Sequence, residues 1–156
     1  MNDFGFDNFK KLATYGNVIR LYDTYYSMPR LYIVTPTYKR KTQIAELTRL
    51  KNALWNVPKV HWIVIEDATN KTYKIANFLW NSKLSYTHLN EPTPRNLSQI
   101  KIDYRTHFKH KAAAQRNVAI QWLREHAFKV DPDDVVYFAD DDNSYHLRLF
   151  QDVFIF

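Results

Sequence analysis

The stretch VHWIVIED, residues 60–67, decides the fold class of this chain. It is a short run of mostly apolar, β-branched residues that ends abruptly in two carboxylates, which is typical of a buried strand. Runs of the same kind occur at residues 31–38 (LYIVTPTY) and 135–143 (VVYFADDDN), and residues 84–91 (LSYTHLNE) are typical of a strand of mixed polarity. We expect Pro36 to end the first strand. The three apolar runs indicate a parallel sheet with buried strands, because such sheets are covered on both faces.

Helical patterns separate these strands. Residues 42–57 place apolar side chains at helical spacing up to Pro58, and residues 70–82 and 111–128 predict two further helices. Strands that alternate with helices favour βαβ units with right-handed crossovers. The expected fold class is therefore α/β with a mainly parallel sheet. Residues 91–110 contain two prolines and no clear period, so we expect a long loop there.

Composition excludes several classes of protein. The chain has 156 residues, of which 46% are hydrophobic and 24% are charged, so it is sized for one core-forming domain. It has only 2 glycines and no cysteine. These counts exclude a glycine-rich phosphate loop, disulfide scaffolds, thiol catalysis and cysteine-based zinc sites. The sequence also contains no apolar run of about 18 residues that could span a membrane, and no signal-peptide pattern at its start.

The net charge of +6 suits anionic partners, among them nucleic acid, phosphorylated ligands and sulfated sugars, without choosing among them. Basic residues are concentrated between Arg95 and Arg116, where a solvated face is as good an interpretation as a binding face. Two sequons, at Asn70 and Asn96, would permit glycosylation in a secretory lumen.

Polar side chains follow three of the predicted strands. They are Pro36-Thr37-Tyr38, Glu66-Asp67 and Asp140-Asp141-Asp142. In an open parallel sheet, ligands bind outside the carboxyl ends of the strands. The sequence therefore predicts a binding site at this edge of the sheet.

The aspartate triplet has two interpretations. Three successive carboxylates repel one another unless they are solvated or neutralised by a cation. Along an extended chain, Asp140 and Asp142 lie on one side and Asp141 on the other. Oxygen ligands without His or Cys favour Mg²⁺ or Mn²⁺ shared with substrate phosphates. The alternative is an acidic turn or a helix N-cap before Tyr145.

Arg116 lies on the apolar stripe of its predicted helix, where an unpaired guanidinium is costly. Two hypotheses follow with equal weight, a clamp for phosphate or sugar and a structural ion pair with an aspartate. Lys111, at the start of this helix, would add positive charge for a bound phosphate. His107 and His110 are three residues apart, but no third ligand is evident, which disfavours zinc.

Several motifs together resemble one known family. From about residue 30 to the C-terminus the chain carries, in this order, LYIVTPTYKR, TQIAELTRLKNAL, VHWIVIEDA, YTHLN, AAAQRNVAIQWLR and VVYFADDDNSY. This order resembles the β-1,3-glucuronosyltransferases of the glycosaminoglycan linker and related glycan pathways. The resemblance implies a GT-A fold, Mn²⁺, and inverting transfer of glucuronic acid from UDP-glucuronate to a terminal galactose in β-1,3 linkage. It also implies a type II membrane protein of the Golgi, facing the lumen, that is a homodimer at full length.

The same resemblance implies roles for individual residues. Pro36, Thr37 and Tyr38 would line the uridine, and Asp67 would recognise the uracil ring. In the triplet, Asp142 would hold the Mn²⁺ that bridges the diphosphate, Asp141 would contact the ribose, and Asp140 with Arg116 would orient the glucuronate. Lys111 stands where many members carry Arg, and its ammonium offers a point charge instead of a bidentate fork.

The length departs from the family pattern. The sequence has no counterpart of the family's acceptor half, of the glutamate that acts as general base, or of the membrane anchor. We expect an extension at residues 1–29 followed by an incomplete donor-binding subdomain at 30–156, with little or no transfer by this chain alone. The alternatives are a non-catalytic module that binds a UDP-sugar and metal, and a nucleic-acid-binding protein, which is disfavoured because the aromatic residues occupy core-facing positions.

Overall fold

A computed structural model describes residues 28–94, 112–126 and 133–152. Its strands are β1 (Leu31–Thr37), β2 (Val60–Glu66), β3 (Ser85–Asn90) and β4 (Val135–Phe138). Its helices are α3 (Gln43–Leu54), α4 (Tyr73–Ser82), α7 (Ala113–His126) and α8 (Leu147–Asp152). Residues 1–27 of the predicted extension (1–29) lie outside the described residues. The same is true of residues 95–110 of the predicted loop (91–110).

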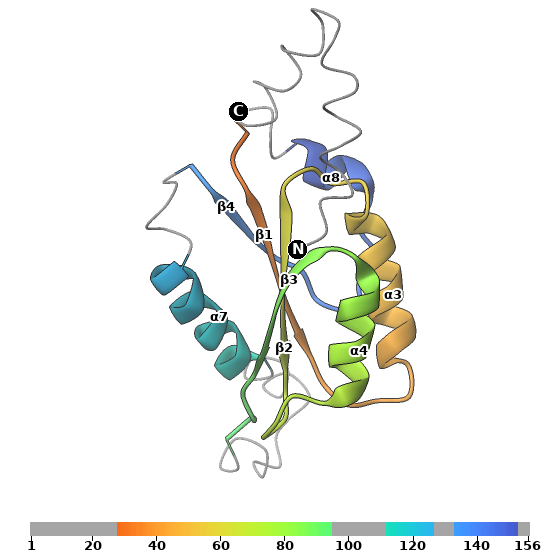
Figure 1. Ribbon diagram of the computed structural model, residues 1–156, viewed down its shortest axis with the longest axis vertical. Coiled ribbons are helices and arrows are strands. Elements are labelled where there is room, and N and C mark those ends of the chain that lie inside the picture. Colours follow the sequence, from red (N-terminus) through yellow and green to blue (C-terminus); the bar gives the residue numbers. More distant parts are fainter. Residues whose placement is uncertain (1–27, 95–111, 127–132, 153–156) are drawn as a thin grey trace, which may run out of the picture.

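The four strands form one sheet in the order β3-β2-β1-β4 (Figure 1). Every pair is parallel, with Leu31 opposite Val60 at one end of the β1–β2 pair and Thr37 opposite Glu66 at the other. The predicted α/β class with a parallel sheet is confirmed. The register brings the carboxyl ends of β1, β2 and β3 to the same edge of the sheet.

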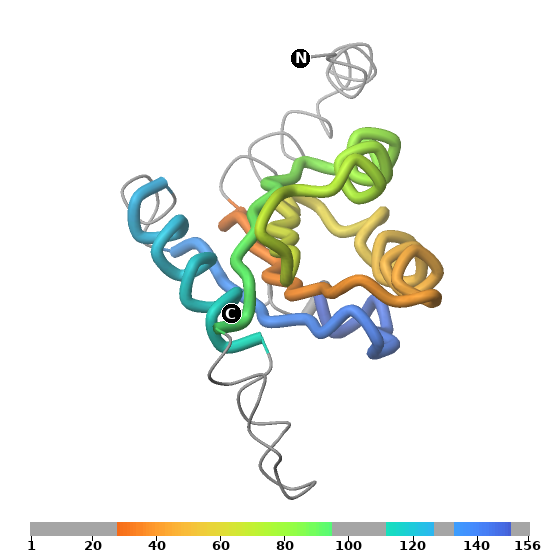
Figure 2. The backbone as a smooth tube through the Cα atoms, turned by 90° about the horizontal axis from the view of Figure 1, so that it is seen from below, coloured from red at the N-terminus to blue at the C-terminus, as the bar shows by residue number. Residues whose placement is uncertain are grey.

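Helices cover both faces of the sheet. Figure 2 shows α3, α4 and α8 on one face and α7 on the other. The larger core lies on the first face, where leucines of α3 and α4 and Phe150 of α8 pack against Trp62 and other inward residues of the sheet. On the opposite face, Ala119 and Leu123 of α7 pack against residues of β1 and β2. None of the described helices has the length and apolar character that crossing a membrane requires.

Two sequence expectations about where a strand and a helix end are wrong. Pro36 does not end β1 but lies within it, opposite Ile65. The backbone of Val34 faces β4, where its carbonyl accepts from the Ala139 amide. Pro36, two residues on, faces the same side beyond the last β1–β4 pair, so its missing N–H breaks no ladder bond. The helix expected at residues 42–57 ends at Leu54, and Val57 then donates to the Leu54 carbonyl at 3.0 Å.

The strand expected to be buried near the aspartates is instead a short edge strand. β4 has four residues, none of them fully buried, and Phe138 is 42% exposed. Its only described neighbour in the sheet is β1. An apolar run therefore identified the strand correctly but not its burial, because burial depends on strand order.

The α7 face contains a histidine held between two hydroxyl groups. His61 on β2 lies 2.7 Å from Ser85 Oγ through Nδ1 and 2.8 Å from Thr87 Oγ1 through Nε2. Its ring stacks on Trp122 of α7 with centroids 5.6 Å apart. Burial, with a smaller contribution from the charge of Arg30, lowers the pKa of His61 to about 4. The imidazole is therefore neutral in the folded protein at physiological pH.

This lowered pKa predicts a loss of stability in mild acid. The unfolded chain binds a proton at His61 near pH 6.5, whereas the folded chain does so only near pH 4. The contribution of His61 to the free energy of unfolding is therefore complete above pH 6.5 and is lost as the pH falls to 4. We expect a cost of roughly 2–3 kcal/mol by pH 4. Chemical denaturation of wild type and His61→Gln between pH 7 and 4 measures it, and the variant should show a shallower decline. The exposed His126→Gln is the control; equal slopes for wild type and His61→Gln would contradict the assignment.

Candidate functional site

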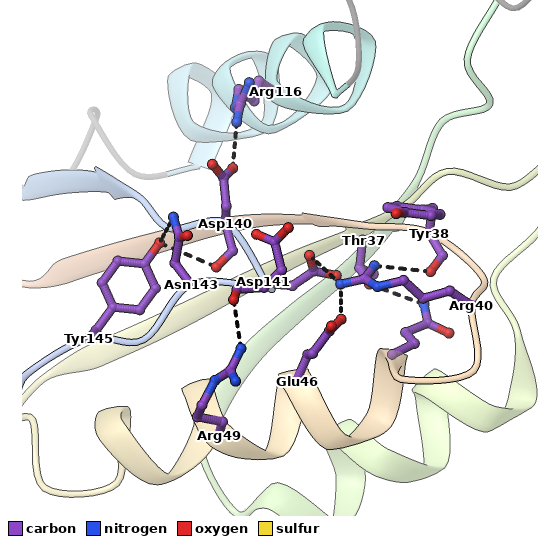
Figure 3. A network of polar contacts seen from close by, with 12 residues as sticks. Thr37, Tyr38, Arg40, Glu46, Arg49, Arg116, Asp140, Asp141, Asn143 and Tyr145 are labelled. Atoms are coloured by element: carbon purple, nitrogen blue, oxygen red, sulfur yellow. Dashed lines mark hydrogen bonds and ion pairs between the residues drawn. The ribbon is translucent and has the colours of Figure 1, made fainter. Parts of the chain in front are cut away.

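The carboxyl ends of β1, β2 and β3 are joined by backbone hydrogen bonds. The amide of Asp67 donates to the Thr37 carbonyl at 2.8 Å, and the amide of Glu91 donates to the Glu66 carbonyl at 2.9 Å. The chain after β4 brings the aspartate triplet beside this edge, between α7 and α3 (Figure 3). The predicted gathering of polar groups at one sheet edge is therefore present.

The first aspartate faces α7. Asp140 Oδ1 accepts from Arg116 Nη2 at 2.6 Å, and both side chains are only half-buried. Of the two hypotheses for Arg116, the structure contains the ion pair with an aspartate. Because the pair is partly exposed, the remaining N–H groups of Arg116 can still donate to an anionic ligand.

The second aspartate faces the opposite way and is buried. Asp141 is 5% exposed, and its Oδ1 lies 2.8 Å from Arg40 Nη2. Arg40 also pairs with Glu46 of α3. Burial acts to lower the pKa of Arg40, but the two carboxylates outweigh it and raise that pKa above its usual value. Asp140 and Asp141 therefore lie on opposite sides, as alternation predicts, and each has a cationic partner.

The third aspartate is held by its backbone. Arg49 Nη2 of α3 donates to the Asp142 carbonyl at 2.6 Å. The Asp142 side chain is exposed, and within the described ranges its carboxylate has no hydrogen bond or ion pair. Nearby, the Tyr145 hydroxyl donates to the Asp140 carbonyl at 3.2 Å. The turn is thus fixed from several directions while one carboxylate is left open to solvent.

The residues expected to line a uridine differ in accessibility. Pro36 and Thr37 are buried, and Thr37 Oγ1 accepts from Gln43 Nε2 at 3.1 Å. Tyr38 is 49% exposed, and the guanidinium of Arg40 lies 4.4 Å from the centre of its ring. Tyr38 is therefore the one of these three whose side chain can contact a ligand directly.

Asp67 is exposed, and both its carboxylate oxygens accept from Thr93. The Thr93 amide donates to Oδ1 at 2.7 Å and the Thr93 hydroxyl to Oδ2 at 2.6 Å. The buried Gln115 of α7 supports this segment by donating to the Glu91 carbonyl at 2.6 Å. Each carboxylate oxygen has a second lone pair, so Asp67 retains acceptor capacity toward a ring N–H.

A buried carboxylate beneath this edge was not predicted to have a structural role. Glu66 is 3% exposed and accepts from the Thr72 amide at 2.9 Å, from the Thr72 hydroxyl at 2.7 Å, and from His88 Nε2 at 2.6 Å. Thr72 is the N-cap of α4. Glu66 therefore ties the β2–α4 loop, which contains Asp67, to β3.

Within the described part of the chain, a hard cation can be held by a single carboxylate together with ligand phosphates, but not by a cluster of side chains. The described residues contain no group of three or more His, Cys, Asp or Glu side chains that could hold a metal ion. Mg²⁺ and Mn²⁺ that act on phosphates are commonly held by one or two carboxylates together with the phosphates themselves. The open carboxylate of Asp142 fits that pattern. Lys111, His107 and His110 lie outside the described residues.

Comparisons with known proteins find one glycosyltransferase family. The profile of glycosyltransferase family 43 matches residues 50–154. Galactosylgalactosylxylosylprotein 3-beta-glucuronosyltransferase 1 of Pan troglodytes is 47% identical over 129 residues, covering 81% of this chain and 38% of that protein. Galactosylgalactosylxylosylprotein 3-beta-glucuronosyltransferase 2 of Mus musculus is 41% identical over 127 residues, covering 81% of this chain and 37% of that protein.

Among solved structures, the S. aureus TarS 1–349 chain is 18% identical with a TM-score of 0.49, covering 79% of this chain and 30% of that chain. The chain spans about 38% of the length of the Pan troglodytes relative.

Proposed function

The chain belongs to glycosyltransferase family 43, and on that premise we propose that the edge of its sheet is the donor-binding part of a glucuronosyltransferase. The observation that carries this proposal is the acidic turn after β4. Two of its carboxylates are paired with arginines, one from the loop between β1 and α3 and one from α7, and the third, on Asp142, is exposed without a described partner. One open carboxylate beside two carboxylates that arginines already neutralise suits a cation that is shared with a diphosphate.

The donor is UDP-glucuronate, bound along the carboxyl ends of the strands. The exposed ring of Tyr38 supplies a flat surface for the uracil, and Asp67 supplies an acceptor for its ring N–H. The family resemblance assigns the ribose to Asp141, which is 5% exposed and paired with Arg40, and the glucuronate to Asp140 with Arg116. Pro36 and Thr37 shape the wall behind Tyr38, and Lys111 adds charge toward the phosphates. These roles rest on the family resemblance and, for all of these residues except Lys111, on the placement described above.

Asp142 is the residue that would hold Mn²⁺. Its ligand atoms are oxygens, which hard divalent ions prefer, and the absence of a described three-residue metal cluster is compatible with a site completed by phosphate oxygens. When bound, such an ion would stabilise the negative charge that develops on the departing UDP. Arg49 keeps the backbone of Asp142 in place for this role.

The transfer of glucuronic acid is proposed for the whole protein, because this chain spans about 38% of the length of the Pan troglodytes relative. The acceptor is a glycan with a terminal galactose, and the new bond is a β-1,3 linkage formed with inversion. Such a reaction needs a general base that removes the proton from the acceptor hydroxyl. The secretory pathway, specifically the Golgi lumen, is the proposed site of action, with a membrane anchor and a homodimer belonging to the full-length protein.

A calorimetric titration of UDP tests the donor-site proposal. With Mn²⁺ present we expect saturable binding, and with EDTA we expect that binding to fall by at least about tenfold, because the diphosphate loses its bridging cation. ADP serves as the comparison nucleotide, and a nucleic-acid duplex as the comparison anion. Nucleic-acid binding that weakens steeply with salt and ignores Mn²⁺, combined with no UDP binding by folded protein, would contradict the proposal.

A further inference from the structure

Arg40 connects two strand ends that the donor-site proposal treats separately. It lies in the loop between β1 and α3, with its guanidinium 4.4 Å from the centre of the Tyr38 ring, and its Nη1 donates to the Tyr38 carbonyl at 3.4 Å. The same guanidinium lies 2.8 Å from Asp141, which follows β4 (Figure 3). Glu46 of α3 pairs with it from below. One side chain therefore contacts an exposed aromatic ring and a buried carboxylate.

The burial of Asp141 depends on this arginine. Asp141 is 5% exposed, and its Oδ2 is buried with no hydrogen-bond partner in the described part of the chain. A buried carboxylate with an unsatisfied oxygen persists only where a fixed cation compensates it, and unsatisfied buried groups recur at functional sites. Arg40 is itself fixed, because its Nη2 lies against both Asp141 and Glu46 while its Nη1 donates to the Tyr38 carbonyl. A lysine ammonium could not make these contacts together.

We propose that Arg40 is a positioning residue that fixes the Tyr38 ring and the Asp141 carboxylate relative to each other, and so builds the nucleoside half of the site. This inference rests on the proposed function. An exposed aromatic ring beside a hydrogen-bond acceptor is the combination that recognises a flat base joined to a hydroxyl-bearing sugar. Arg40 itself touches neither ligand nor metal in this arrangement and acts through its two neighbours.

The diphosphate half of the site is held by different arginines. Arg49 fixes the backbone of Asp142, and Arg116 pairs with Asp140. In the described residues Arg40 contacts neither Asp140 nor Asp142. Changing Arg40 should therefore affect the nucleoside half and spare the metal-diphosphate half. A residue that only stabilised the fold would affect both halves alike.

Two probes separate these halves. UDP with Mn²⁺ reports on the whole site, and inorganic pyrophosphate with Mn²⁺ reports on the diphosphate half alone. For Arg40→Gln we expect the Kd of UDP to rise by about 10- to 100-fold, the range that follows from losing hydrogen bonds to a charged group. The Kd of pyrophosphate should stay within about twofold of wild type. Arg124→Gln, which changes an exposed arginine of α7, should leave both values unchanged.

A second variant keeps the test decisive if Arg40→Gln does not fold. Arg40→Lys retains a positive charge beside Asp141 and Glu46 but loses the planar contact with Tyr38, so it should fold and still weaken UDP selectively. If Arg40→Lys weakens the binding of UDP and of pyrophosphate equally, or weakens neither, the inference about Arg40 is overturned. The donor-site proposal would still stand in that case, provided that the wild-type protein binds UDP with Mn²⁺. If folded wild-type protein binds no UDP with Mn²⁺, the proposed function fails and this inference fails with it.

Discussion

Replacing Asp142 by alanine is expected to remove the metal-dependent binding of UDP. The Asp142 carboxylate is the member of the triplet that has no described partner, whereas Asp140 and Asp141 are each paired with an arginine. Removing one member of a charge pair in a binding site costs about 2–5 kcal/mol, which is roughly a 30-fold to several-thousand-fold rise in Kd. Calorimetric titration of UDP in the presence of Mn²⁺ measures this change.

The structure also predicts that this variant keeps its fold. Arg49 binds the Asp142 carbonyl and not its carboxylate, so the contact survives the loss of the side chain. Unfolding temperatures of wild type and Asp142→Ala should therefore agree closely. Glu125→Ala, at an exposed position of α7, is the control and should bind UDP as wild type does. Retention of wild-type affinity by folded Asp142→Ala would mean that the cation is held elsewhere.

Replacing Glu66 by alanine is expected to have the largest effect on stability. The change leaves His88 Nε2 and both the amide and the hydroxyl of Thr72 without their buried acceptor. Breaking a buried, hydrogen-bonded charged group in this way costs about 3–5 kcal/mol. That is a large part of the total stability of roughly 5–15 kcal/mol that a domain has. Denaturation in urea measures the difference in the free energy of unfolding.

Two further variants show whether the contacts of Glu66 cause this loss. Glu66→Gln keeps one carbonyl acceptor and a similar volume, so it should lose less stability than Glu66→Ala. Thr72→Ala removes the hydroxyl that both caps α4 and donates to Glu66, keeps the contact of the Thr72 amide with Glu66, and should cost about 1 kcal/mol. A change of less than 1 kcal/mol for Glu66→Ala would show that the network of Glu66, Thr72 and His88 does not stabilise the folded chain.

The fold class was predictable because the strands and helices carry strong local patterns. β1 and β2 are continuous apolar runs, and the leucines of α3 recur at helical spacing, so both kinds of element could be identified without tertiary information. Position within the sheet was not predictable in the same way. The partial exposure of β4 and the tolerance of Pro36 within β1 both follow from the strand order, which is set by packing between distant segments.

The candidate site was predictable where a residue conflicts with its local pattern. Arg116 stands on an apolar stripe and the aspartates follow an apolar strand, and the structure pairs Arg116 with Asp140. Arg40 gave no such signal, because it lies in the basic run YKRK, which is also typical of a solvated loop. The partnership of Glu66 with His88 requires the β2–β3 register, which no single segment contains. The ligand roles of Tyr38, Asp67 and the triplet remain predictions.

The most direct test of the central claim is anomalous diffraction from crystals grown with Mn²⁺ and UDP. The account predicts an anomalous peak within coordination distance of the Asp142 carboxylate, about 2.0–2.2 Å as for other small divalent ions bound to oxygen, with the diphosphate completing the coordination. The uracil should lie against Tyr38. An Mn²⁺ peak that is remote from Asp142, or UDP bound away from the carboxyl ends of the strands, would contradict the assignment of this sheet edge as the donor site.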